Sequence, residues 1–257
     1  MIGPKSLSAA MKLPPATVEF SAIAAPRAVD EIESQIRAMV AQGLLKPGDR
    51  LPSERDLAAK LNVSRNTLRE AMRTLERAGI LEMRKGTHGG AYILHGSSDS
   101  IIDGLSNLYH LGAISPEQLT EARIWLSEIV VRVACERATE EDLRALDENI
   151  QAGRQAIADD RFDIRQRLHR EFHLILARMT RNPIIEATMA GVMEVMGLFI
   201  ERIGPSENAF TEPARDRLMK HLRKRDAEAA VKEMTSYLKR LQTRYLDQWA
   251  ERRPPEH

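Results

Sequence analysis

Four arginines lie at four-residue spacing, at Arg65, Arg69, Arg73 and Arg77. Residues four apart fall on one face of a helix, so these side chains would form a stripe of guanidinium groups. A guanidinium offers a planar fork of donors that matches a phosphate or the edge of a guanine. The spacing therefore indicates an anionic partner opposite the stripe. The alternative is a surface helix whose arginines are only solvated.

The stretch around the stripe, LPSERDLAAKLNVSRNTLREAMRTLERAGI, predicts two helices separated by a tight break. Ser53 would cap a short helix that ends near Leu61. Ser64 would cap the next helix, over 65–78, which Gly79 ends. The free backbone N–H groups behind such a cap favour a phosphate.

One face of the longer helix is apolar, because Leu68, Met72 and Leu75 recur at helical spacing. This face should lie against the core, so the arginine stripe should face outward. Beyond the helix, ILEMRKGTHGGAYIL predicts a hairpin with strands at Ile80–Arg84 and Ala91–Leu94. This order of elements is that of a winged helix-turn-helix, whose second helix enters a DNA major groove.

The residues that could contact DNA in this geometry share exposed positions on the helix pair and the hairpin tip. Arginines offer two donors to a base or phosphate, and a glycine beside cations lets the tip approach the backbone or minor groove closely. The candidates are Arg55, Ser64, Arg65, Asn66, Thr67 and Arg69 on the helix pair, and Arg84, Lys85 and Gly86 in the hairpin.

Charge alone does not identify this partner. The chain has 38 basic and 37 acidic residues, which nearly cancel. Residues 27–94 hold twelve Lys or Arg and nine Asp or Glu, a difference of only +3. The inference therefore depends on where the cations lie, on one helix and one hairpin tip, rather than on their number.

The segment LLKPGDRLPSERDLAAKLNVSRNTLREAMRTLERAGILEMRKGTHGGAYI resembles the DNA-binding domain of GntR-family transcriptional regulators over about fifty residues. PGDRLPSERDLA, VSRNTLREA and the glycine-bearing hairpin match that family in order and spacing. The resemblance implies a dimer on a short palindrome, in agreement with two-fold recognition of half-sites. It places the family's DNA-contacting positions on Arg55, Ser64, Arg65, Asn66, Thr67, Arg69, Lys85 and Gly86.

Composition favours a helical, reducing-compartment protein. Hydrophobic residues make up 43% of the chain and aromatics only 4%, so Leu, Ile, Met and Ala must fill the core, which favours helix packing. Cys135 is the single cysteine, which excludes an internal disulfide or a multi-cysteine zinc site, and its apolar neighbours predict a buried, inert thiol. We expect a cytoplasmic protein.

The fold class expected is mainly α, with a winged helix-turn-helix followed by an all-helical antiparallel bundle. Helices are predicted at about 116–137, 139–159, 161–180, 183–203, 212–225 and 226–250. The expected organisation is a flexible extension (1–26), the winged helix-turn-helix domain (27–95), a linker helix (96–114), a helical effector-binding and dimerisation domain (115–250) and a disordered tail (251–257).

A second group of polar residues lies in the helical part. HREFH puts His169 and His173 on one helix face, where two imidazoles could share a divalent metal; a hydrogen-bonded histidine pair is the alternative. Arg123 could clamp a carboxylate from the inner face of its helix, or form a surface ion pair with Glu121 or Glu128. Trp125 and Met193 are expected in the core.

The helical part resembles the FCD ligand-binding domain of the FadR subfamily, over roughly residues 100–245. EARIWLSEIVVRVACERAT, HREFHLILARMTRNP and LRKRDAEAAVKEMTSYL carry the resemblance. It implies an FCD-like antiparallel helical bundle that binds a carboxylate-like metabolite or an acyl-CoA in its interior. Many members of that family hold a metal there.

The family's metal is usually bound by one aspartate and three histidines, the aspartate in a D-x-x-F-H pattern. Here His169 replaces the aspartate and His173 is retained. Aligning the last two helices on Asp226 and Ala230 places Arg215 and Tyr237 at the remaining positions, and a register shifted by one turn would bring in His221 instead. Because a guanidinium cannot bind a metal, we expect no metal cofactor, with His169 and His173 as the fallback ligands.

The same substitutions produce a set of donors suited to an anion: Arg123, His169, His173, Arg215 and Tyr237. The resulting hypothesis is a non-enzymatic, dimeric transcriptional regulator, a repressor in most of the family, controlled by an organic acid or acyl-CoA. Two alternatives remain: a DNA-binding protein whose helical domain only dimerises, or a metal-dependent enzyme at His169 and His173 with a DNA-binding appendage.

Overall fold

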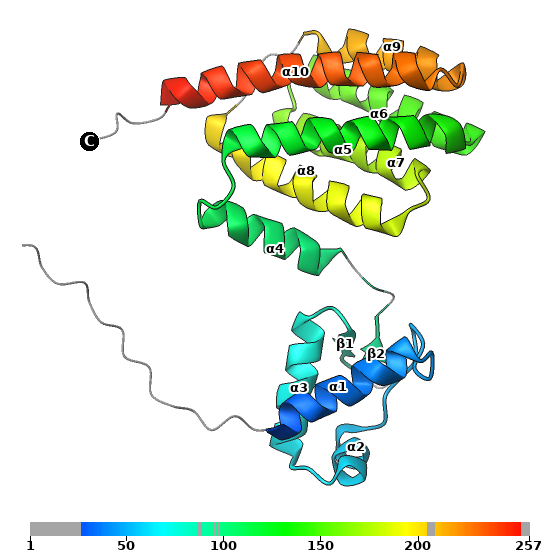
Figure 1. The fold of residues 1–257 in the computed structure, drawn as a ribbon, viewed down its shortest axis with the longest axis vertical. Coiled ribbons are helices and arrows are strands. Elements are labelled where there is room, and N and C mark those ends of the chain that lie inside the picture. Colours follow the sequence, from blue (N-terminus) through cyan, green and yellow to red (C-terminus); the bar gives the residue numbers. More distant parts are fainter. Residues whose placement is uncertain (1–26, 87–88, 95, 97, 205–208, 253–257) are drawn as a thin grey trace, which may run out of the picture.

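The computed structural model describes residues 27–86, 89–94, 96, 98–204 and 209–252 of the protein, and Figure 1 shows their arrangement. A small unit of three helices and one hairpin lies at one end, and a larger all-helical bundle lies at the other. The predicted N-terminal extension, the tip residues Thr87 and His88, and residues 253–257 of the predicted tail lie outside the described residues.

The small unit has the predicted order of elements. Its elements are α1 (Arg27–Ala41), α2 (Glu54–Leu61), α3 (Arg65–Arg77), β1 (Leu81–Arg84) and β2 (Gly90–Ile93). The two strands pair antiparallel, with Leu81 opposite Ile93. Leu68, Leu75 and Leu81 are fully buried between helices and hairpin, so the unit has its own core.

Side-chain caps fix the two helices of the helix-turn-helix. The Ser53 hydroxyl accepts the backbone N–H of Asp56 at 3.2 Å, and the Ser64 hydroxyl accepts that of Thr67 at 3.1 Å. Between the helices, Asn62 adopts the left-handed conformation with φ 53°, which ends α2 within a single residue. These local signals position the first turn of α3.

The predicted linker helix is docked against the bundle. Helix α4 (Asp99–His110) packs against α8 (Pro183–Ile203), as Figure 1 shows. Gly191 allows this approach, because a Cβ there would lie 2.6 Å from Cδ1 of Leu105. At its other end, the Ser100 hydroxyl donates to the carbonyl of Ala78 at 3.4 Å, so α4 connects the two parts through contacts as well as through the chain.

The remaining helices form the bundle. They are α5 (Pro116–Arg137), α6 (Glu140–Ala158), α7 (Phe162–Met179), α8, α9 (Thr211–Arg223) and α10 (Ala227–Arg252). Helix α5 packs against α7, α8 and α10 and supplies the centre of the core. Helix α5 begins with a capping box at Ser115, α6 begins with one at Thr139, and α8 has Pro183 at its first position. These local signals explain why the observed helix boundaries follow the sequence pattern closely.

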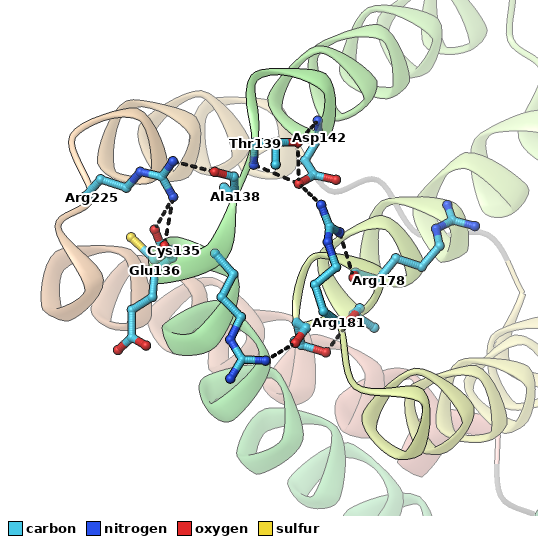
Figure 2. Close-up of polar contacts among 11 residues, drawn as sticks. Cys135, Glu136, Ala138, Thr139, Asp142, Arg178, Arg181 and Arg225 are labelled. Atoms are coloured by element: carbon cyan, nitrogen blue, oxygen red, sulfur yellow. Dashed lines mark hydrogen bonds and ion pairs between the residues drawn. The ribbon is translucent and has the colours of Figure 1, made fainter.

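Helix ends inside the bundle are held by arginine side chains (Figure 2). Arg225 donates to the carbonyls of Cys135 (2.9 Å), Glu136 (3.2 Å) and Ala138, at the end of α5. Arg181 donates to Asp142 at 2.6 Å and so ties the loop after α7 to the start of α6. Arg225 lies between α9 and α10, so the junction of these two helices caps the end of α5.

Replacing Arg225 with methionine is expected to lower the free energy of unfolding by about 1–3 kcal/mol, because carbonyls at the end of α5 lose their donor. Urea denaturation followed by circular dichroism measures the change. Arg223→Met is the matched control, since Arg223 makes only a surface ion pair with Asp147. It should cost less than about 1 kcal/mol. Equal effects of the two variants would contradict the capping role.

The predictions for three core residues have different outcomes. Cys135 and Met193 are buried as expected, and burial raises the pKa of the Cys135 thiol. Trp125 was expected in the core, but 60% of it is exposed, next to the exposed Ile129 one turn later. The reason is the helix face: the buried side of α5 runs through Ile124, and Trp125 points about a quarter turn away from it.

Helix α8 is long and apolar enough to cross a membrane by length and composition, and among the described residues it alone meets that test. This is weak evidence, because core helices of bundles meet the same test. Helix α8 packs against α4, α5, α7 and α10, and it carries Glu194, which pairs with Arg170 of α7. We interpret α8 as a core helix of the bundle.

Candidate DNA interface and effector pocket

The outer face of α3 presents the predicted stripe. Arg65, Arg69, Arg73 and Arg77 are exposed, while the opposite face of the helix is buried. A shallow depression of about 630 Å³ runs along this outer face. Of the other candidates on the helix pair, Arg55, Ser64 and Asn66 are exposed and Thr67 is half-buried. Most candidates of the helix pair are therefore open to a partner, and Asn66 and Arg69 both line the depression on α3.

Two of these arginines already contact carboxylates. Nε of Arg69 lies 2.8 Å from Oε2 of Glu54, which belongs to α2. Nε of Arg55 lies 3.4 Å from Oδ1 of its neighbour Asp56. Glu54 therefore holds the guanidinium of Arg69 across the two helices. Sequence reasoning missed Glu54, because a contact fifteen residues apart leaves no periodic signal.

Contacts with the strands hold the first cation of the hairpin in place. The guanidinium of Arg84 stacks on the ring of Tyr92, 4.2 Å from its centroid, and also pairs with Glu82. Lys85 is exposed, and Gly86 has φ +100° with open space where a Cβ would lie. Arg84 is thus anchored to the strands, whereas Lys85 and Gly86 are open to a partner.

Arg50 is a further residue of this surface that the sequence analysis did not single out. Its guanidinium donates to the carbonyl of Gly89 and so holds the hairpin tip. Its backbone forms a bridge to Tyr92 of β2. The only sequence signal was its place after the PGD turn, which does not indicate a contact 39 residues away.

In the bundle, the structure brings Arg123 and the two histidines together. Arg123 is only 2% exposed, so its predicted alternative, a surface ion pair with Glu121 or Glu128, is wrong. Its Nη2 atom lies 2.7 Å from Nε2 of His169 and 2.9 Å from Nε2 of His173. One guanidinium nitrogen thus joins both imidazoles, through atoms on α5 and α7.

Arg215 also contacts this cluster, and Tyr237 lies near enough to act electrostatically on Arg123. Nη2 of Arg215 lies 3.1 Å from Nδ1 of His169, and its guanidinium stacks on Phe172 at 4.4 Å. Tyr237 is buried, and its hydroxyl has no hydrogen-bond partner among the described residues. The predicted helix register that selected Arg215 agrees with this contact. We name Arg123, His169, His173, Arg215 and Tyr237 the inner cluster.

The inner cluster holds two buried guanidinium groups with little negative charge near them. Burial lowers the pKa of Arg123, against the opposing effect of Tyr245 and Tyr237, yet a guanidinium remains charged in proteins. Among the described residues, Arg215 forms its one ion pair with Glu212, at 3.6 Å, and Glu212 also lies 3.4 Å from Arg154. Since buried charges are normally paired, two guanidiniums here lack a full counter-charge.

Both histidines of the inner cluster are neutral. Burial, followed by the positive charge of Arg123, holds the pKa of His169 and of His173 well below its ordinary value. Arg215 acts in the same direction on both rings. The imidazoles can therefore accept from Arg123, as the short distances require.

The donor set does not suit a metal ion. The Nε2 lone pair that each histidine would offer already accepts from Nη2 of Arg123. Arg215 supplies a cation where a third ligand would be needed, and a guanidinium has no lone pair to give. Among the described residues, no group of three or more His, Cys, Asp or Glu side chains could hold a metal.

A cavity of about 600 Å³ opens onto the inner cluster. Residues of α7, α8 and α9 line most of it, His169 and Arg215 among them, and Tyr245 of α10 also lines it. Arg123 stands behind His169 rather than on the wall. The side formed by α8 is largely apolar and includes Met193 and Met196. The cavity therefore combines a polar floor with an apolar wall, as ligand sites commonly do.

Sequence reasoning missed two polar residues that line this cavity. They are Gln166, whose Nε2 lacks a partner among the described residues, and Tyr245. Their spacing does not differ from that of ordinary core or surface positions. Only the packing of separate helices shows that they converge.

Two family models match the chain. Residues 28–93 match the family described as "Bacterial regulatory proteins, gntR family", and residues 118–240 match the FCD domain. The first match covers the winged unit and the second covers most of the bundle. Neither match distinguishes a subfamily, so membership of the FadR subfamily stays a prediction.

Curated relatives include the HTH-type transcriptional repressor NanR of Cronobacter sakazakii, 33% identical over 168 residues, which is 63% of this chain. NanR of Klebsiella aerogenes is 31% identical over 166 residues. In both cases the match spans 62% of the relative's own length. These relatives therefore share about three fifths of their length with this chain.

Among solved structures, Streptococcus agalactiae GntR is similar in fold, with a TM-score of 0.61 over 84% of this chain and 99% of that chain. The sequences are 23% identical, so this likeness concerns the fold alone. Together, the two family matches cover both folded parts in their order along the chain. The chain therefore carries a helix-turn-helix domain of the GntR family, over residues 28–93, followed by an FCD domain, over residues 118–240.

Proposed function

We propose that the protein is a cytoplasmic transcriptional regulator, a repressor, that binds a palindromic operator as a dimer. The observation that carries this proposal is the capped N-terminal turn of α3, where Arg65, Asn66 and Arg69 are exposed beside a basic hairpin. A helix presented in this way fits a major groove, and the hairpin then lies over the backbone or minor groove.

An exposed apolar surface supports the dimer. Trp125 and Ile129 lie one turn apart on α5, 60% and 52% exposed. Large exposed aromatic and aliphatic side chains at adjacent positions are typical of protein interfaces. A second copy of the chain is the proposed occupant, because a palindrome requires two winged units related by a two-fold axis.

The helical domain is proposed to bind a small anionic effector, an organic acid or an acyl-CoA. The inner cluster supports this, since buried Arg123 and Arg215 lack a full counter-charge and an adjacent cavity of about 600 Å³ can admit a ligand. An anion in the cavity would supply the missing acceptor.

Helix α8 offers a physical route from effector to DNA. One side of α8 lines the cavity through Met193 and Met196, and another side, at Gly191, supports α4. Helix α4 contacts the winged unit through Ser100. A ligand that favours one position of α8 would thereby shift the population of winged-unit arrangements, provided it binds the two states differently.

Selection from a random pool of DNA duplexes tests the proposed function. The purified full-length chain should enrich a short sequence with two-fold symmetry, and its affinity should fall as salt concentration rises. A parallel selection without protein is the control. If no sequence is enriched above that control, the protein is not a sequence-specific DNA-binding regulator.

The metal expectation has its own test. Protein purified without chelator should contain no stoichiometric zinc, nickel or manganese by elemental analysis, because Arg123 already contacts Nε2 of both histidines and Arg215 stands at a ligand position that a guanidinium cannot fill. About one metal per chain, lost in His173→Ala, would contradict this expectation. It would also restore the pair His169 and His173 as metal ligands.

A further inference from the structure

The hydrogen atoms on Arg123 determine which ring nitrogen of each histidine carries a proton. Nη2 of Arg123 has two hydrogens, and two Nε2 atoms lie within hydrogen-bond distance, at 2.7 and 2.9 Å. The two hydrogens match the two acceptors. Both His169 and His173 are then neutral rings with their proton on Nδ1.

This tautomer creates a conflict on the cavity side of His169. Its Nδ1–H now faces Nη2 of Arg215 at 3.1 Å, and both atoms are donors. In the opposite tautomer, two donors would meet at the other ring nitrogen. Nε2–H of His169 would then face Nη2 of Arg123 at the shorter distance of 2.7 Å. A neutral ring cannot accept at both nitrogens, so the inner cluster lacks one acceptor.

The missing acceptor would have to lie at the floor of the cavity, beside His169 and Arg215. His169 and Arg215 line the cavity, whereas Arg123 lies behind His169. Arg215 is 4% exposed, and its Nε atom has no hydrogen-bond partner among the described residues. A carboxylate fits this place, because it has two acceptor oxygens and a charge that balances the buried guanidinium.

The charged residues that line the cavity limit which groups the rest of the ligand can carry. The lining includes five acidic residues, Asp160, Asp163, Glu194, Glu201 and Glu212, against the four arginines Arg165, Arg167, Arg170 and Arg215. A ligand with several phosphates would meet more acidic than basic groups there. The apolar side formed by Met193 and Met196 instead suits an uncharged body.

We propose that the cavity binds a small organic acid through a single carboxylate, held directly by Arg215 and by Nδ1–H of His169, with no metal between them. Arg123 is a positioning residue, since it fixes the tautomer that makes His169 a donor. This proposal rests on the proposed function, of which it specifies the effector, and it favours an organic acid over an acyl-CoA.

Calorimetric titration of the full-length protein tests the binding site. The probes are acetate, pyruvate, gluconate and benzoate, with acetamide and benzamide as neutral counterparts, and inorganic phosphate and acetyl-CoA as other anions. At least one carboxylate should bind saturably, with the same affinity in EDTA, while the amides do not bind. No carboxylate binding, tighter binding of phosphate or acetyl-CoA, or loss of binding in EDTA would each overturn the proposal.

Variants locate the contact. Arg215→Met should weaken carboxylate binding by about 10-fold or more, since it removes a charge-assisted donor. If the methionine variant does not fold, Arg215→Lys takes its place in the test. Lysine keeps the positive charge but lacks the two-pronged guanidinium, so this variant should also bind the carboxylate more weakly. Arg144→Met is the matched control, because Arg144 is an exposed arginine of α6 that does not belong to this lining. Equal binding by the Arg215 variants and wild type would overturn the assignment.

The positioning role of Arg123 has a spectroscopic readout. In ¹⁵N-histidine spectra of the wild-type protein, the signals of His169 and His173 should be those of the Nδ1–H tautomer, and Arg123→Met should change them. The Nε2–H tautomer at His169 in the wild type would overturn this role. DNA selection on the same preparation separates the two proposals, because DNA binding without carboxylate binding rejects only the site.

Discussion

The isolated winged unit, residues 27–95, is expected to bind the selected palindrome about 10²–10⁴-fold more weakly than the full-length chain. The unit has its own buried core, which includes Leu68 and Leu75, so it should fold without the bundle. What it lacks is the bundle that would join two copies and hold both units near their half-sites at high effective concentration. Fluorescence anisotropy with labelled duplex measures both affinities.

Circular dichroism of the isolated unit provides the control that its helices are formed. Sedimentation of the full-length chain provides the second observation. A full-length monomer that binds the palindrome tightly, or an isolated unit that binds it as well as the full chain, would show that dimerisation through the bundle contributes nothing to affinity.

Arg65→Ala and Arg69→Ala are each expected to weaken binding to the selected palindrome by about 1–3 kcal/mol and to relax specificity at one base position. Both side chains are exposed on the outer face of α3, so their removal leaves the core intact. Glu54 holds Arg69 in the free protein, and that contact orients the guanidinium before DNA arrives.

Gel-shift titration of each variant measures this loss, and circular dichroism confirms unchanged helix content. Arg144→Ala is the matched control, because Arg144 is an exposed arginine on α6 in the other part of the protein. If both α3 variants bind like Arg144→Ala, α3 is not the recognition helix.

The sequence predicts the helices well because their ends are marked locally. Ser53, Ser64, Ser115 and Thr139 each accept a backbone N–H of the first turn, as their positions before apolar periodic segments indicate. Such signals need no knowledge of the rest of the chain. The predicted boundaries therefore agree closely with those of the structure.

Features that depend on separate helices coming together are harder to predict. A large aromatic side chain such as Trp125 is expected in the core, but the orientation of α5 leaves it exposed. The contact from Arg225 to Cys135 spans ninety residues. The docking of α4 on α8 depends on the single missing Cβ of Gly191. None of these features leaves a local pattern.

The inner cluster was predictable in its members but not in its geometry. Histidines four residues apart and a family register indicate His169, His173 and Arg215, and these residues do meet in the structure. The single Arg123 nitrogen between the two imidazoles was not predictable, because it depends on how α5 crosses α7. That nitrogen is the main reason why we propose an anion site rather than a metal site here.

The most direct test is the affinity for the selected palindrome with and without a carboxylate that binds the cavity. If the protein is a ligand-controlled regulator, saturating carboxylate should change the DNA dissociation constant by about 5–150-fold, and bound DNA should change the carboxylate affinity by the same factor. Arg215→Met should remove this response but keep DNA binding. A carboxylate that saturates the cavity while leaving DNA affinity unchanged would contradict the account.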